Sequence, residues 1–163
     1  MFDRILLALD DSPAGEVALL FAGALARRTG ASVHVLHVNE RVVAGAGTTL
    51  RTRDEVSDLV TSAVRQLADI GVPASGSACV AWHRGVPARI VAKAEGEAAD
   101  AIVLGSTRRR LWGRLFAAQV RERTTRLSSL TVLTAPSPLR VTSLPEAESG
   151  DGRLDQALDS LLR

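Results

Sequence analysis

Short apolar runs alternate with longer stretches of helical periodicity over most of the chain. The apolar runs predict five strands, at residues 5–9, 32–38, 74–82, 100–104 and 130–134. Between them, apolar residues spaced three and four apart predict four helices, at residues 13–30, 52–71, 87–98 and 117–127. Residues 39–51 contain two glycines and show no clear period, so we interpret them as a loose, mobile connection.

Polar residues mark where the first two helices begin. Ser12 is placed to cap the first helix, with Pro13 at the first helical position. Thr52 and Glu55 have the spacing of a capping box at the start of the second helix. The third strand, residues 74–82, is rich in small residues, and we expect it at an edge of the sheet.

The alternation of strands and helices predicts an α/β fold of the Rossmann-like class. Strands joined through a helix run parallel with right-handed crossovers, so the sheet is open and has helices on both faces. The runs at residues 5–9 and 101–104 are apolar throughout, which is typical of strands buried on both faces. We therefore expect these two strands side by side at the centre of the sheet, with two helices on each face.

A change of composition after Pro136 divides the chain into two parts. With 163 residues, of which 46% are hydrophobic, the chain is long enough for one packed domain, which we assign to residues 1–136. Residues 137–163 are interpreted as a flexible linker followed by a short amphipathic C-terminal helix. A helix of this length is not stable alone in water. We therefore expect it to fold when it docks on another surface, and a protein partner is one candidate for that surface. The apolar face of the helix would be formed by Leu154, Leu158, Leu161 and Leu162.

Composition and charge argue against several classes of function. Aromatic residues make up 3% of the chain and Tyr is absent, which argues against base stacking on an aromatic platform. The formal net charge of +2 is too small for nonspecific binding of nucleic acid. Cys79 is the single cysteine, so the sequence offers neither an intramolecular disulfide nor a zinc-ligand spacing. With no apolar run of membrane-spanning length and no cleavage site, we expect an unprocessed, soluble, cytoplasmic protein.

Segments in a fixed order carry a resemblance to a known family. They are Ile5-Leu6-Leu7-Ala8-Leu9-Asp10-Asp11-Ser12, Leu36-His37-Val38, Gly85-Val86-Pro87 and Ala99-Asp100-Ala101-Ile102-Val103-Leu104-Gly105-Ser106. In this order and spacing, residues 2–136 resemble the universal stress protein family. The resemblance implies a five-stranded parallel sheet in the order 3-2-1-4-5, a cytoplasmic homodimer and a role in stress resistance. We expect the dimer to form through the fifth strand, from Leu130 to Thr134, because an uncovered sheet edge invites pairing.

The resemblance also implies a nucleotide site at the carboxyl ends of the first and fourth strands. Asp10 matches the family's acid that faces the nucleotide, and Val38 matches the position beside the adenine. The nucleotide-binding branch has a phosphate loop with three glycines followed by Ser or Thr. Here Gly105 keeps the first glycine, whereas the remaining positions are occupied by Arg108, Ala118 and Gln119. Asp10 has an alternative role as a cap of the following helix, and Val38 has one as a core residue.

The altered loop leaves two functions open. The first is a non-enzymatic dimer that acts in the stress response as an interaction or regulatory module, requires no cofactor and has weak or no nucleotide binding. The alternative is a switch that binds ATP or AMP with Mg, uses Gly105 and Arg108 for the phosphates, and hydrolyses ATP slowly at most. A left-handed backbone at Arg108 costs about 1–3 kcal/mol, and a charge-assisted bond to phosphate returns about 1.5–3 kcal/mol. The two contributions nearly cancel, so the energies do not decide between the functions.

Two further groups of residues are candidates for a binding or catalytic site. The arginines from Arg108 to Arg110 lie where this fold class places ligands and are a candidate site for an anionic ligand or acidic partner, with a solvated surface as the alternative. His34, His37 and His83 have no serine at a motif spacing. His34 and His37 are an odd number of residues apart, so they cannot share one face of a strand. We interpret these histidines as core or edge residues.

Overall fold

A five-stranded parallel sheet forms the centre of the computed structural model, which describes residues 1–44, 47–49, 51–106 and 113–137. From one edge to the other, the strands are β4 (Ala74–Trp82), β2 (Ser32–Ala44), β1 (Arg4–Ala8), β5 (Ala101–Leu104) and β6 (Thr131–Thr134). When the five parallel strands are numbered by their order in the chain, their order across the sheet is 3-2-1-4-5. The predicted fold class and strand order are confirmed, and β4 lies at an edge as expected.

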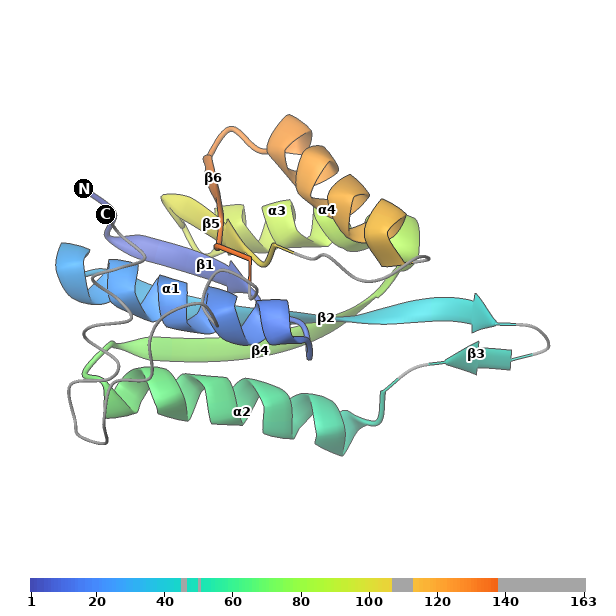
Figure 1. Cartoon of the computed structure of the whole chain (residues 1–163), viewed down its shortest axis with the longest axis horizontal. Helices are drawn as coiled ribbons and strands as arrows, with labels where there is room; N and C mark the ends of the chain where they lie inside the picture. The colour runs from blue at the N-terminus through green and yellow to red at the C-terminus, as the bar shows by residue number, and fades with distance from the viewer. Residues whose placement is uncertain (45–46, 50, 107–112, 138–163) are drawn as a thin grey trace.

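Helices cover both faces of the sheet (Figure 1). One face carries α1 (Pro13–Thr29) and α2 (Arg53–Asp69), and the other carries α3 (Val86–Gly96) and α4 (Gly113–Leu127). A short 3₁₀ turn, η1 (His83–Gly85), leads from β4 into α3. This arrangement follows from the apolar strands, which expose two hydrophobic surfaces that must both be covered.

The core is built around the paired strands β1 and β5. Ile5, Leu6, Leu7, Ile102 and Val103 are all 0% exposed. Side chains alternate along each strand, so Ile5 and Leu7 pack with α1 and α2 while Leu6 packs with α3. The two strands predicted to be central are therefore central, and they are parallel neighbours.

The prediction of a loose connection over residues 39–51 is wrong. β2 continues to Ala44 and then pairs in antiparallel register with β3 (Gly47–Thr49), forming a hairpin arm that projects beyond α2 (Figure 1). β-branched residues explain the longer strand, because Val42 and Val43 lie opposite Thr49 and Thr48. On the other side of β2, the Arg41 guanidinium lies 5.2 Å from the centre of the Trp82 ring.

The start predicted for the fourth helix also needs correction. α4 begins at Gly113, not at residue 117, because the segment that follows Gly113 continues with the good helix formers Arg114 and Leu115. The linker and C-terminal helix expected in residues 138–163 lie outside the described residues. The assignment of residues 1–136 as the domain and residues 137–163 as a tail therefore remains a prediction.

The central position of Leu6 leads to a stability prediction. Leu6→Ala should lower the free energy of unfolding by about 2–5 kcal/mol, because it removes buried contacts and leaves a cavity. The control is Leu127→Ala, at a position that is 57% exposed, where we expect a change within about 0.5 kcal/mol. Urea unfolding followed by circular dichroism measures both, and equal effects of the two substitutions would contradict the assigned core.

Candidate functional site

The loop after β1 is organised by the start of α1. Ser12 caps the helix, with its Oγ accepting a hydrogen bond from the Gly15 amide at 3.1 Å. The same hydroxyl donates to Asp10 Oδ1 at 2.5 Å. The predicted cap is therefore present, and one oxygen of the Asp10 carboxylate is already used to hold it. Asp10 itself is exposed at the carboxyl end of β1.

Gly15 allows Asp10 to lie against the first turn of α1. A Cβ atom at Gly15 would lie 2.1 Å from the Asp10 carbonyl oxygen and 2.7 Å from Asp10 Oδ1. Neither the backbone oxygen nor the hydrogen-bonded carboxylate can move aside easily. The position of the acid thus depends on the absence of a side chain at residue 15.

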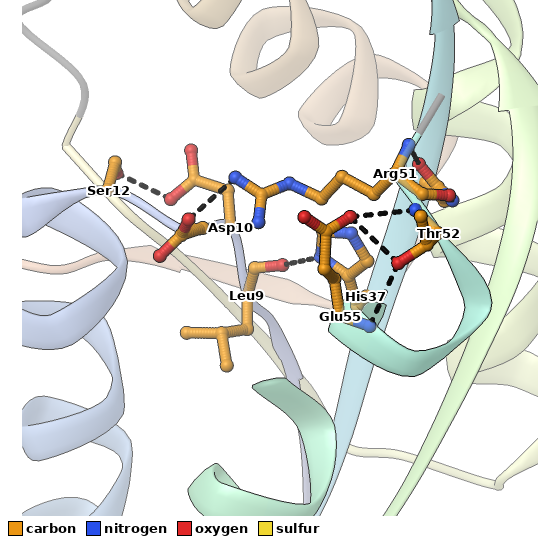
Figure 2. A network of polar contacts seen from close by, with 9 residues as sticks. Leu9, Asp10, Ser12, His37, Arg51, Thr52 and Glu55 are labelled. Atoms are coloured by element: carbon orange, nitrogen blue, oxygen red, sulfur yellow. Dashed lines mark hydrogen bonds and ion pairs between the residues drawn. The ribbon is translucent and has the colours of Figure 1, made fainter. Parts of the chain in front are cut away.

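Arg51 ties the segment before α2 to the loop after β1. Its guanidinium Nη2 lies 2.6 Å from Asp11 Oδ2. Its backbone is held by Asn39 on β2, whose Nδ2 donates to the Arg51 carbonyl at 3.0 Å and whose Oδ1 accepts from the Arg51 amide at 3.2 Å. Figure 2 shows Arg51 reaching across the carboxyl ends of β1 and β2. The sequence predicts a loose connection that includes Asn39 and Arg51, so sequence reasoning missed this contact.

The residues that follow Arg51 fix the start of α2. Thr52 and Glu55 form the predicted capping box, with Thr52 Oγ1 accepting from the Glu55 amide at 3.3 Å and the Thr52 amide donating to Glu55 Oε2 at 2.8 Å. The Thr52 hydroxyl also donates to Glu55 Oε2 at 2.9 Å, and the bonds that the Thr52 amide and hydroxyl donate to this carboxylate lower the pKa of Glu55 below its ordinary value. The carboxylate is therefore ionised at neutral pH and also complements the helix dipole.

His37 lies beneath this network (Figure 2) and is 5% exposed. Its Nδ1 is 2.9 Å from the Leu9 carbonyl oxygen, and because a carbonyl only accepts, Nδ1 carries a proton. Its Nε2 is buried and has no hydrogen-bond partner among the described residues. His34 lies on the opposite face of β2, which confirms that the two histidines do not share a face.

The loop after β5 approaches the same region from the neighbouring strand. A Cβ atom at Gly105 would lie 3.1 Å from the Ala14 carbonyl oxygen, so the loop passes close to the first turn of α1. Ser106 Oγ donates to the Pro136 carbonyl at 2.7 Å. Asp10 and Gly105 thus lie at the carboxyl ends of adjacent parallel strands, where open α/β sheets bind ligands.

The other predicted site residues have different positions. Val38 is half-buried and packs on the α3 face with the apolar cluster around Leu36, as its alternative role requires. Arg108 lies outside the described residues, as do Arg109 and Arg110. Ala118 and Gln119 belong to helix α4, and Gln119 is exposed. The sequence therefore located the ends of β1 and β5 to within one residue, whereas β2 continues past Val38 and the last two positions of the phosphate-loop pattern, Ala118 and Gln119, lie within α4.

A cavity of about 370 Å³ extends from the loop after β1 between α1 and α2. Asp10, Asp11 and Ser12 form its polar end, and Leu20, Leu59 and Gln66 are among the helix residues that line it. A mixed lining of this size suits a small organic ligand that carries polar groups.

The described residues contain neither a metal-binding group nor a membrane-spanning helix. Within the described ranges, the structure contains no group of three or more His, Cys, Asp or Glu side chains that could hold a metal ion. In the same part of the chain, no helix has the length and apolar character needed to cross a membrane.

Comparison with known proteins places this geometry in a family. Residues 1–136 match the universal stress protein family. No curated protein matches the chain significantly. Among solved structures, the chain is similar to a universal stress protein from Archaeoglobus fulgidus DSM 4304, with 21% identity and a TM-score of 0.64. The match covers 83% of this chain and 44% of that one, so the chain spans less than half of that protein's length.

Two further similar structures contain nucleotides. One is the universal stress protein from Archaeoglobus fulgidus in complex with dAMP, with 23% identity, a TM-score of 0.59 and coverage of 83% of this chain and 98% of that one. The other is a family protein from Arabidopsis thaliana with AMP bound, with 16% identity, a TM-score of 0.58 and coverage of 83% and 92%. At these low sequence identities, the similarity to the two structures supports the fold of this chain alone.

The close contact at Gly15 leads to a prediction of opposite effects at two glycines. Gly15→Ala should lower the free energy of unfolding by about 1–3 kcal/mol, because overpacking against Asp10 outweighs the better helix propensity of Ala. The control, Gly96→Ala, adds a methyl group at a helical position with no atom within 4 Å of the new Cβ. That variant should be as stable as the parent or more stable by up to about 1 kcal/mol. Thermal unfolding measures both, and a stabilised Gly15→Ala protein would show that the contact is not tight.

Proposed function

Because the chain belongs to the universal stress protein family, we propose that it acts in the stress response as a cytoplasmic, dimeric interaction or regulatory module whose nucleotide binding is weakened or lost. The observation that supports this function best is the early start of α4 at Gly113. Counted from Gly113, Ala118 is the sixth helical residue and Gln119 the seventh. These are the positions at which the family's phosphate loop has its last glycine and its hydroxyl residue.

The position in the helix matters because a phosphate loop works through backbone amides. In an α-helix the first four N–H groups lack a partner within the helix, whereas later ones donate to the carbonyl four residues earlier. The amides of Ala118 and Gln119 are therefore committed to α4 and are not available to a phosphate. At the opposite side of the site, Asp10 already accepts a hydrogen bond from Ser12. Both features favour weak nucleotide binding.

The second candidate is a nucleotide-binding switch of the same family. Two similar structures contain dAMP or AMP, and Gly105 keeps the close approach to the start of α1 that brings the two loops together. In this alternative, Gly105 and Arg108 hold the phosphates of ATP or AMP, with Mg as the counterion. The two candidates differ in measured affinity, which gives a direct test.

The dimer is proposed to form through β6, which lies at the edge of the sheet. Thr131 and Thr134 are exposed, whereas Val132 and Leu133 are half-buried. The Ala135 amide donates to the Leu104 carbonyl at 2.8 Å, so odd-numbered residues of β6 direct their amides toward β5. By the alternation of a parallel ladder, the amide of Thr134 points to the edge that no other described strand covers, and we propose that a second copy pairs there.

Nucleotide titration tests the proposed loss of binding. We expect half-saturation by AMP or Mg-ATP above about 1 mM, which corresponds to less than about 4 kcal/mol of binding free energy. Isothermal titration calorimetry on the full chain measures this affinity. A micromolar dissociation constant for the unmodified protein would replace the proposed function by the switch. Arg108→Gly then serves as the companion variant, because tighter binding would show that Arg108 hinders the phosphates and weaker binding that it holds them.

A proline substitution tests the proposed interface. Thr134→Pro removes an amide that points to the open edge and leaves the hydrogen bonds between β5 and β6 in place, so it should shift a dimer to monomer at micromolar concentration. Thr134→Ala is the matched control, since it removes the side chain and keeps the amide. Sedimentation equilibrium measures the mass, with circular dichroism as a check of folding. A folded Thr134→Pro protein that remains dimeric would place the interface elsewhere.

A further inference from the structure

A second polar cluster lies at the opposite ends of the strands, on the face covered by α3. His34, near the start of β2, is 6% exposed. Both of its ring nitrogens have serine partners on the neighbouring edge strand β4. Nδ1 is 2.8 Å from Ser75 Oγ, and Nε2 is 2.8 Å from Ser77 Oγ. The side chains of Ser75 and Ser77 share one face of β4 because they are two residues apart.

A carboxylate decides which nitrogen carries the proton. Glu97, directly after α3, has its Oε2 3.7 Å from His34 Nδ1, and it is held there by an ion pair of 2.7 Å with Lys93. Burial lowers the pKa of His34 below 6.5, while Glu97 raises it and Lys93 and Arg4 lower it further. The ring is therefore mostly neutral at pH 7. A lone pair on Nδ1 would face the carboxylate unfavourably, so the proton belongs on Nδ1.

This tautomer gives the two serines different roles. The Nδ1–H group donates to Ser75 Oγ, so Ser75 acts as an acceptor. Nε2 carries the lone pair and accepts the hydroxyl proton of Ser77. Ser77 is thus the serine whose oxygen is next to a neutral base, which is the arrangement that activates a serine nucleophile.

The cluster lies at the edge of the sheet beside a cavity. Among the described strands, β4 pairs with β2 alone, and Ser77 is half-buried while Ser75 is exposed. The cavity has a volume of about 300 Å³, which is that of a small ligand site, and it is bordered by Arg4, His34, Ser75 and Glu97. Ser77 does not line this cavity and lies next to it, on the other ring nitrogen of His34. A buried histidine that serves only the fold needs two hydrogen-bond partners. It does not need a cavity or a carboxylate beside it.

The same edge offers a backbone donor next to Ser77. The Val33 amide donates to the Pro73 carbonyl at 2.9 Å, so in this parallel ladder the odd-numbered residues of β4 face β2. The amides of the even-numbered residues therefore point to the open edge, and that of Ala78 directly follows Ser77. An amide donor next to a nucleophile can stabilise negative charge that develops on a substrate oxygen.

We propose that Ser77, His34 and Glu97 form an acyl-transfer site for small activated esters. Ser77 Oγ attacks the ester carbonyl carbon while His34 Nε2 accepts the hydroxyl proton. The bond to the leaving oxygen breaks, that oxygen takes the proton from His34, and Ser77 retains the acyl group. Water then attacks the acyl carbon with His34 again accepting a proton, and this proton returns to Ser77 Oγ as the acid leaves. Glu97 is a positioning residue that fixes the tautomer of His34.

The test uses the full chain with p-nitrophenyl acetate. Cys79 is first replaced by Ala, because Ser75, Ser77 and Cys79 alternate onto one face of β4 and a thiol also accepts acetyl groups. Peptide mass spectrometry should find the acetyl group on Ser77. Ser77→Ala should remove this label, and His34→Gln should slow its formation by about 100-fold or more, as expected for the loss of a general base. Absence of acetyl-Ser77 in the parent protein would overturn the proposal without any further variant.

Ser75→Ala is the matched control, because it removes a hydrogen bond to the same imidazole. It should leave the rate of acetylation at Ser77 within about threefold, whereas an equal loss on replacing either serine would show that the cluster only supports the fold. Labelling should rise with pH as His34 loses its proton, with the midpoint of the rise below that of an ordinary histidine. Glu97→Gln should move this rise to lower pH, because Glu97 raises the pKa of His34. The cluster lies far from the carboxyl ends of the strands, so this proposal does not rest on the proposed function.

Discussion

The burial of the apolar residues of β1 and β5 on both faces is the constraint on which the rest of the structure depends. Ile5 to Leu7 and Ala101 to Leu104 are buried on either face of the sheet, so helices are required on both sides, and parallel strands with helical connections supply them. The same pairing brings the loops after the two strands to one edge. Asp10 and Gly105 become neighbours of a single candidate ligand site for this reason, although 94 residues separate them in the sequence.

The two edge strands face a different requirement. Within the described part of the chain, each pairs with a neighbouring strand on one side only, and each has more exposed residues than β5 at the centre. β6 is short, and its exposed residues are threonines. On the α3 face of β4, serines take positions that are apolar in the central strands, and they surround His34. Clusters of polar side chains therefore lie at both ends of the strands, around Asp10 at the carboxyl ends and around His34 at the amino ends.

The sequence was sufficient for the central strands, because their apolar runs have one interpretation in this fold class. It was sufficient for the caps at Ser12 and Thr52, because capping depends on residues that are close in sequence. It failed for the arm of β2 and β3, where residues 39–51 were interpreted as a loose connection although Val42 and Val43 continue the strand and pair with β3. The start of α4 was missed because the apolar period becomes clear only some residues after the helix begins.

The cluster around His34 could not be predicted from sequence patterns, for a different reason. Its histidine, serines and glutamate come from β2, β4 and the end of α3, and the register between β2 and β4 brings them together. The sequence contained a partial signal, since Ser75 and Ser77 alternate onto one face. What it could not provide was the partner strand or the face that His34 occupies.

Arg51 illustrates how one residue can be held by two interactions of different kinds. Its guanidinium pairs with the exposed Asp11, whereas its backbone is bonded to Asn39, which is 6% exposed. Dissolved ions screen exposed charges over about 8 Å at physiological ionic strength, but they leave hydrogen bonds between neutral groups largely unchanged. Rising salt therefore weakens the pairing of Arg51 with Asp11 more than it weakens the hydrogen bonds that hold the backbone before α2. Ionic strength can thus alter the charge presented beside Asp10 without moving the fold that carries it.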